Sequence, residues 1–224
     1  MNRERVPHDP APDEGRALES QPPRAAPTVP YFLYWRYRHW VDHTRWDRRW
    51  GTETAIREKK YLESIPEHAT THAEWYEPIR WRWFKPMLAE LPVDPRQFTF
   101  IDLGSGKGRA LFFAALSGFR RVIGVEFMLG DATTHALPEG PLVVFPYNPF
   151  RGPVMSAVVA RIAERARNTE VATCVLYKQP QCAGMFDADP VFVKITDRRG
   201  NGRWFMGTEP YVAYRVEAIT VRSA

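Results

Sequence analysis

The sequence predicts an α/β protein built on a mostly parallel β-sheet. Its central stretch, residues 98–127, reads FTFIDLGSGKGRALFFAALSGFRRVIGVEF, which is an apolar strand-like run, a glycine turn, an apolar helical segment and a second buried strand. Two more apolar runs, 142–145 and 171–177, stand on either side of an amphipathic helical segment at 154–166. Strands that alternate with helices are typical of βαβ units, in which neighbouring strands run parallel.

The composition fits one domain of ordinary size with additional segments. The chain has 224 residues, a net charge of +5 and an isoelectric point near 9.3, which favours acidic or macromolecular partners but equally fits a mildly basic cytosolic enzyme. Cys174 and Cys182 are too few for a disulfide framework, so a reducing compartment is expected. No apolar run is long enough to span a membrane and the N-terminus is not signal-like, so we expect a cytoplasmic protein without membrane contact.

Two segments precede the predicted sheet. Residues 1–30 mix proline, alanine, arginine and acidic residues without periodicity, so we expect a disordered tail. Residues 31–97 are expected to form a helical cap that is rich in aromatic and basic side chains. Within 31–50 aromatic and arginine side chains alternate closely. One interpretation is a lid whose arginines bind phosphates while its aromatic rings stack on bases. The other is a helix whose aromatic rings cover the core while its arginines reach solvent.

The last part of the cap is predicted to be a helix within residues 74–91, because its apolar residues recur at mainly helical spacing. Pro78 fits the first turn of this helix, and Pro86 is expected to kink or divide it. Two pairs of histidines in the cap stand one helical turn apart, but neither pair has a third ligand at a suitable spacing. No metal site is therefore expected.

The glycine turn after the first strand has the features of a ligand-binding loop. Gly104, Gly106 and Gly108 stand at alternate positions, so the backbone can turn tightly and come close to a ligand, and the helix that follows offers free N–H groups. The dinucleotide fingerprint would require a glycine or alanine where Arg109 stands, and the phosphate-binding P-loop would require a serine or threonine after Lys107. Neither of these two motifs is present.

The run Asp102–Gly108, together with Glu126 at the end of the next strand, resembles the first motif of class I S-adenosylmethionine-dependent methyltransferases. This resemblance implies a three-layer Rossmann-like methyltransferase sheet with a C-terminal antiparallel hairpin. The runs 191–196 and 212–216 stand where that hairpin is expected. Residues 98–224 would then be the S-adenosylmethionine-binding domain. The cofactor-binding residues implied by the resemblance are Asp102, Gly104, Ser105, Gly106, Gly108, Glu126 and Asp131.

The resemblance also implies what the acidic residues do. Asp102 would orient the glycine loop near the methionine amine, Glu126 would bind the ribose, and Asp131 would bind the adenine amine. Asp131 lies in a Gly-Asp-Ala run that resembles the adenine-side loop of the family, yet it follows the second strand almost directly. We therefore expect one helix and the edge strand of the sheet to be missing.

Residues 146–150, PYNPF, follow the strand at 142–145 and resemble the fourth motif of the family, which lines the methyl-acceptor site. Tyr147 and Asn148 are the residues expected to face the acceptor. The related motif with an asparagine, two prolines and an aromatic residue holds an amino group, so an amino acceptor is one hypothesis. The alternative is that this run only makes a turn.

Residues 50–54, WGTET, end the aromatic segment at Gly51 and resemble a short element that precedes the glycine loop in uncharacterised bacterial methyltransferases. In such proteins this element would be expected to fold over the cofactor. Thr52 and Thr54 are therefore additional candidates for the cofactor site.

The function predicted from the sequence is an S-adenosylmethionine-dependent methyltransferase with an unknown acceptor on a protein, a nucleic acid or a small molecule. Because the sulfonium is already activated, such an enzyme mainly has to hold the acceptor in line with the methyl carbon. Two other classes stay open. One is a truncated, inactive relative that serves as a binding module, and the other is a nucleic-acid-binding protein that uses residues 31–49.

Overall fold

The computed structural model describes residues 33, 36–37, 40–41, 43–55, 78–125, 136–149, 151–199 and 210–217. The chain divides into two compact units, Met1–Arg38 and His39–Ala224, and every contact given below lies within the second unit. In that unit a π-helical turn, η1 (His43–Asp47), leads into the short helix α2 (Arg48–Trp50). Helix α2 ends at Gly51, whose left-handed backbone (φ 65°) stops the helix at the predicted glycine.

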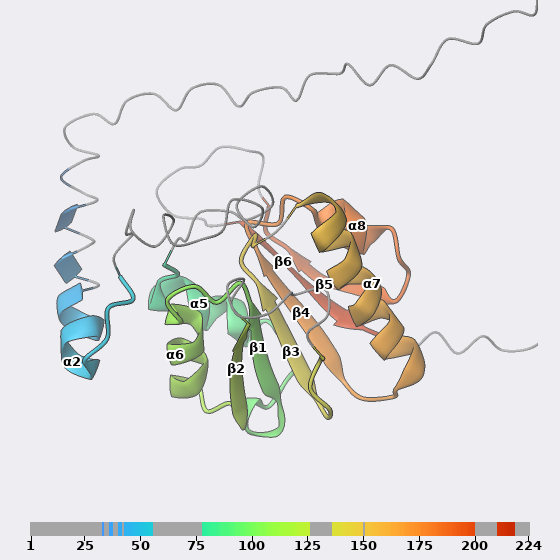
Figure 1. Cartoon of the computed structure of the whole chain (residues 1–224), viewed down its shortest axis with the longest axis horizontal. Helices are drawn as coiled ribbons and strands as arrows, with labels where there is room; N and C mark the ends of the chain where they lie inside the picture. Colours follow the sequence, from blue (N-terminus) through green and yellow to red (C-terminus); the bar gives the residue numbers. More distant parts are fainter. Residues whose placement is uncertain are drawn as a thin grey trace, which may run out of the picture. The chain divides into compact units, whose positions relative to one another are not determined.

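The described residues form a six-stranded sheet in the order β2-β1-β3-β4-β6-β5 (Figure 1). Strands β2, β1, β3 and β4 run parallel, whereas β6 is antiparallel to both β4 and β5. The predicted mixed sheet, mostly parallel with an antiparallel C-terminal hairpin, is therefore confirmed. The strands are β1 (Thr99–Leu103), β2 (Arg121–Val125), β3 (Leu142–Pro146), β4 (Thr173–Lys178), β5 (Phe192–Asp197) and β6 (Tyr211–Val216).

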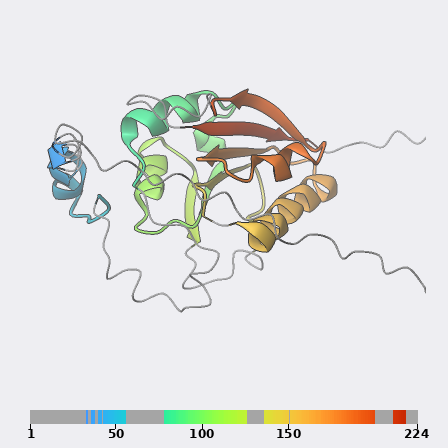
Figure 2. The same ribbon diagram turned by 90° about the horizontal axis from the view of Figure 1, so that it is seen from above.

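Helices cover both faces of this sheet, which gives three layers (Figure 2). Neighbouring side chains of a strand point to opposite faces, so Phe100 packs with α5 and α6 while Ile101 packs with α7 and α8. The core therefore consists of two apolar clusters, one on each face of the sheet. The helices are α5 (Trp81–Ala89), α6 (Arg109–Leu116), α7 (Gly152–Asn168) and α8 (Ala183–Asp187).

Helix α5 begins later than the sequence predicted. Arg80 has an extended backbone (φ −106°, ψ 142°) and its carbonyl accepts the hydrogen bond of the Phe84 N–H at 2.9 Å, so Arg80 is the N-cap. Pro78 therefore precedes the helix instead of lying in its first turn, and Pro86 lies inside the helix as expected. Phe84 is fully buried against Phe100 of β1, so the end of the predicted cap shares the core of the sheet.

Strand β2 forms one edge of the sheet among the described strands, and β5 forms the other. In the expected family fold a further helix and strand would follow β2, and residues 126–135, which would have to contain them, lie outside the described residues. The predicted loss of one helix and one edge strand stays a prediction. Strand β3 then pairs directly with β1, so the carboxyl ends of β1 and β3 lie next to each other.

Candidate cofactor and acceptor site

The glycine loop joins the end of β1 to the start of α6. Gly104, Gly106 and Gly108 have φ values of 89°, 49° and 76°, a backbone region that residues with a Cβ atom rarely adopt. The amides of Gly104 and Ser105 donate to the carbonyl of Val125 at 2.8 and 3.1 Å, which ties the loop to the end of β2. The alternating glycines thus fold into the tight turn that the sequence predicted.

The loop after β3 packs directly on the glycine loop. A Cβ atom at Gly104 would lie 2.4 Å from the Cβ of Pro149, closer than two carbon atoms can approach. Gly104 is therefore required for packing as well as for its backbone conformation. The contact brings the predicted cofactor loop together with the predicted acceptor residues Tyr147 and Asn148, because Pro149 immediately follows them.

Ser105 is 8% exposed and faces strand β2. A Cβ atom at Gly124 would come within 2.8 Å of the Ser105 hydroxyl oxygen and 2.5 Å of the Leu111 Cδ1 atom. Gly124 therefore leaves room for the glycine loop and for helix α6 at the edge of the sheet. The sequence analysis did not single out Gly124, because a lone glycine in a strand indicates close packing but not its partner.

Asp102 is the buried acid of the site. It lies in β1 and is 4% exposed, and no described residue makes a hydrogen bond to its Oδ1 atom. Burial raises the pKa of this carboxyl group to about 8. A buried polar atom without a partner is uncommon in folded proteins, and a carboxylate in this situation is suited to a cationic ligand group.

Asn148 and Tyr147 lie at the carboxyl end of β3. Asn148 is 3% exposed, and the Tyr177 hydroxyl donates to its Oδ1 atom over 3.5 Å. The ring centroid of Tyr147 lies 4.9 Å from the Lys178 ammonium, and its hydroxyl accepts a hydrogen bond of 3.3 Å from Gln179 Nε2. The predicted acceptor residues are therefore surrounded by polar side chains from the end of β4, which the sequence analysis missed.

A buried ion pair connects the segment before the sheet to the start of α6. Arg109 and Asp47 are each 1% exposed, and Arg109 Nη1 lies 3.4 Å from Asp47 Oδ1. The same nitrogen donates to the Thr54 hydroxyl at 3.0 Å, while Arg109 Nε donates to the Ile79 carbonyl at 3.0 Å. Arg109, which stands where the dinucleotide fingerprint requires glycine or alanine, thus holds the segment 47–55 against helix α6.

Thr52 and Thr54, the additional cofactor candidates, donate their hydroxyl hydrogen bonds to Asp47 Oδ1 at 2.9 and 2.8 Å. The Ala55 amide donates to Asp47 Oδ2 at 2.8 Å. Burial alone would raise the pKa of Asp47, but the hydrogen bonds from Thr54, Ala55 and Thr52 and the charge of Arg109 outweigh it and lower the pKa. In this structure the two threonines stabilise an ionised Asp47.

Two predicted cofactor-binding residues, Glu126 and Asp131, lie outside the described residues, as does Phe150, the last residue of the PYNPF run. Within the described ranges, no group of three or more histidine, cysteine, aspartate or glutamate side chains is placed to hold a metal ion. In the same part of the chain, no helix is both long and apolar enough to cross a membrane.

The described elements form an α/β fold with a mostly parallel sheet, and the glycine loop and Asn148 follow the carboxyl ends of its neighbouring strands β1 and β3. In open sheets of this type, ligands generally bind beyond these strand ends. Similar solved structures include a release factor-specific protein-(glutamine-N5) methyltransferase from Alicyclobacillus acidocaldarius, which has 16% identity and a TM-score of 0.38 over 71% of this chain and 98% of that chain. A protein from Pyrococcus horikoshii named as an RNA methyltransferase has 14% identity and a TM-score of 0.42 over 74% of this chain and 100% of that one.

A third structure, a Thermoplasma acidophilum protein, has 19% identity and a TM-score of 0.31 over 55% of this chain and 79% of that chain. No family model and no curated protein sequence matches the chain. The assignment of a function therefore rests on the residues of the site.

Proposed function

We propose that the protein is an S-adenosylmethionine-dependent methyltransferase. The observation that carries this proposal is the buried carboxyl group of Asp102, which has an oxygen without a described partner and lies two residues before the three-glycine loop. The methionine end of S-adenosylmethionine carries an ammonium group, and an unpaired buried carboxylate is the side chain that would bind it. The residues of the described site therefore fit this cofactor.

Each part of the site has a separate task in this proposal. When bound, S-adenosylmethionine supplies an activated methyl group on its sulfonium. Asp102 would hold the ammonium group, and the glycine loop would let the backbone approach the cofactor closely. Glu126 and Asp131, which lie outside the described residues, would bind the ribose and the adenine amine.

Tyr147 and Asn148 would hold the acceptor, which we propose is an amino group. The packing of Pro149 on Gly104 supports this role, because it keeps the acceptor loop beside the cofactor loop. Fixing the acceptor in line with the methyl carbon would supply most of the rate enhancement, since little proton transfer is required of the side chains. The acceptor molecule could belong to a protein, a nucleic acid or a small molecule of the cytoplasm.

The test is calorimetric titration of the full chain with S-adenosylmethionine and S-adenosylhomocysteine at pH 8. We expect micromolar binding that Asp102→Asn or Glu126→Ala weakens by about 1–3 kcal/mol, the effect of losing a hydrogen bond to a charged group. The control is Glu164→Gln, which removes an exposed acid on α7 and should leave the affinity unchanged.

Absence of binding at millimolar cofactor, in a protein that still unfolds cooperatively, would contradict the proposal. That result would favour the inactive binding module. If the protein without cofactor instead bound RNA or DNA with a steep salt dependence, the nucleic-acid-binding hypothesis would be favoured.

A further inference from the structure

Arg109 is a fully buried charged side chain at the start of helix α6. It is 1% exposed, and an arginine is almost never buried to this degree unless it is paired. Its guanidinium carbon lies 5.3 Å from the centroid of the Phe113 ring, while its Nε and Nη1 atoms donate to the Ile79 carbonyl and the Thr54 hydroxyl. These contacts hold Arg109 in one place, although the proposed methyl transfer gives it no task.

The polar partners of Arg109 come from a segment that is distant in the sequence. Asp47 and Thr54 precede Arg109 by 62 and 55 positions, and both belong to residues 47–55, the anchored segment. Within this segment two threonine hydroxyls and one backbone amide donate to the Asp47 carboxylate. Arg109 therefore joins a segment that is folded around a buried carboxylate to the first turn of α6.

The glycine loop is held at both of its ends. At one end the amides of Gly104 and Ser105 donate to the Val125 carbonyl at the end of β2. At the other end Gly108, with a left-handed backbone, is the N-cap of α6, and its amide donates to the Ser105 carbonyl at 2.8 Å. Arg109 follows Gly108 directly, so the position of Arg109 fixes where the loop ends and the helix begins.

The size and charge of Arg109 make this end of the loop depend on the anchored segment. In dinucleotide-binding folds a small residue at the equivalent place lets the helix pack closely on the strand. Arg109 instead carries its charge into the anchored segment, where Asp47 Oδ1 lies 3.4 Å from its Nη1 atom. Separating the two would leave the guanidinium buried without its carboxylate or force it to move. Either change would disturb the end of the glycine loop.

We propose that Arg109 is a positioning residue for the cofactor, and that docking of the anchored segment on Arg109 and binding of the cofactor at the glycine loop favour each other. The proposal rests on the proposed function, because it requires a cofactor at this loop. Coupling between two sites is reciprocal. A docked segment that raises the cofactor affinity by some factor is therefore held more firmly, by the same factor, when the cofactor is bound.

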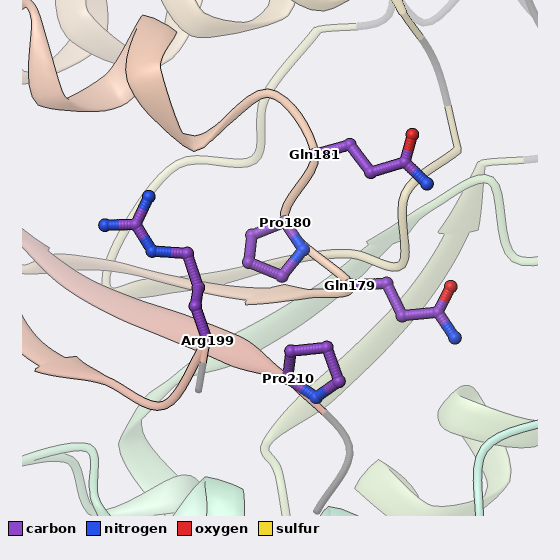
Figure 3. Close-up of a pocket in the computed structure, with 5 residues that line it drawn as sticks. All are labelled: Gln179, Pro180, Gln181, Arg199 and Pro210. Carbon is purple, nitrogen blue, oxygen red and sulfur yellow. The ribbon is translucent and has the colours of Figure 1, made fainter. Parts of the chain in front are cut away.

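A pocket on the side of the sheet that carries the C-terminal hairpin supplies a reference for this coupling. In this pocket Arg199 lies on the opposite side of Pro180 from Gln181 (Figure 3). No residue of the glycine loop or of the anchored segment lines it. Next to Arg199, the Arg198 amide donates to the Tyr211 carbonyl at 2.9 Å. Because this amide follows β5, the edge strand farthest from β2, its exchange should not respond to docking of the anchored segment.

The first test is amide hydrogen exchange of the full chain with and without saturating S-adenosylhomocysteine. The Thr52 amide donates to the Asp47 carbonyl at 3.0 Å and the Ala55 amide donates to Asp47 Oδ2 at 2.8 Å, so both report docking. We expect the ligand to slow their exchange about tenfold, a coupling within the usual range, and to leave the Arg198 amide unchanged. Unchanged exchange at Thr52 and Ala55, or equal slowing of all three amides, would overturn the inference.

The second test is calorimetric titration of Asp47→Asn and Asp189→Asn with S-adenosylhomocysteine. Both variants replace an arginine-paired carboxylate by an amide, and Asp189, the partly exposed partner of Arg167, is the control. We expect Asp47→Asn to weaken the affinity of the folded protein about tenfold and Asp189→Asn to leave it unchanged. A purely structural role of Arg109 would lower the free energy of unfolding of Asp47→Asn without changing its affinity, and that result would contradict the proposed coupling.

The exchange measurement uses the natural sequence, so it decides the question even if Asp47→Asn does not fold. Binding of S-adenosylhomocysteine without any effect on the anchored segment would refute the role of Arg109 alone. Absence of binding at millimolar ligand would contradict the proposed function, and the role of Arg109 would fall with it.

Discussion

Asp102 is a buried carboxyl group whose pKa of about 8 lies well above its value of about 3.9 in an unfolded chain. Between these two pH values the folded protein holds a proton on Asp102 that the unfolded chain has released. The contribution of this group to stability is therefore fully present below pH 4 or so and is lost as the pH rises towards 8. The buried Asp102 carboxyl group thus makes the protein less stable at neutral pH than at pH 4.

This linkage gives a prediction for Asp102→Asn, which cannot ionise. Relative to the natural sequence, the variant should gain about 1.4 kcal/mol in free energy of unfolding per pH unit between roughly pH 4 and pH 8. Urea denaturation at pH 5, 6, 7 and 8 measures the difference. A difference that stays constant over this range would mean that Asp102 does not titrate with a raised pKa.

The same group predicts proton release on cofactor binding. At pH 7 Asp102 is protonated in the free protein, and holding an ammonium group requires its carboxylate form. Binding of S-adenosylmethionine should therefore release close to one proton, and the affinity should rise with pH up to about 8. Calorimetry at pH 7 in buffers with different ionisation enthalpies measures the proton count. Asp102→Asn serves as the control and should release none from this position.

At the scale of secondary-structure elements, the segment 43–55 is attached to helix α6 by two kinds of contact. The Arg109–Asp47 ion pair is fully buried, and beside it Trp46 packs against Phe113 and Trp81 with ring centroids 5.3 and 5.9 Å apart. Arg109 is also the first residue of α6, directly after the glycine loop. The attachment therefore fixes the end of the loop that is proposed to approach the cofactor.

Breaking this ion pair should be costly. Asp47→Ala leaves the Arg109 charge buried without its carboxylate, so we expect a loss of about 3–5 kcal/mol in the free energy of unfolding. The comparison is Asp189→Ala, which removes a partly exposed carboxylate whose Oδ2 atom lies 2.6 Å from Arg167 Nη2. This variant should lose about 1 kcal/mol or less in the free energy of unfolding. Urea denaturation at pH 7 compares the two. Equal small losses would mean that the buried pair does not anchor the segment.

At the scale of the whole molecule, the sheet order brings the glycine loop and the predicted acceptor residues to the same end of the sheet. Strands β1, β3 and β4 are parallel neighbours, so their carboxyl ends bring together the glycine loop, Asn148 and Gln179. The chain connects these ends through helices on opposite faces of the sheet. Residues that are far apart in the sequence, from Gly104 to Gln179, thus follow the ends of neighbouring parallel strands, where ligands of parallel sheets usually bind.

The elements with a strong local signal were predicted well. The apolar helical segment expected after the glycine turn is helix α6 (Arg109–Leu116), and the strand expected at 212–216 is β6 (Tyr211–Val216). Helix α8 was not predicted, because the five residues Ala183–Asp187 are too few for a helical period to be recognised. The late start of α5 was also missed, since the extended backbone of Arg80 has no marker in the sequence.

The sequence by itself determined the strands of the sheet, the helices α6 and α7 and the glycine turn beside Asp102. These features depend on apolar periodicity and on residues that permit unusual backbone angles. Only the tertiary structure decided which residues from distant segments contact one another. It pairs Arg109 with Asp47, places Pro149 on Gly104, and brings Gln179 to the register position next to Asn148. Such contacts join segments that are far apart in the sequence, and local residue patterns do not indicate which of these segments pack together.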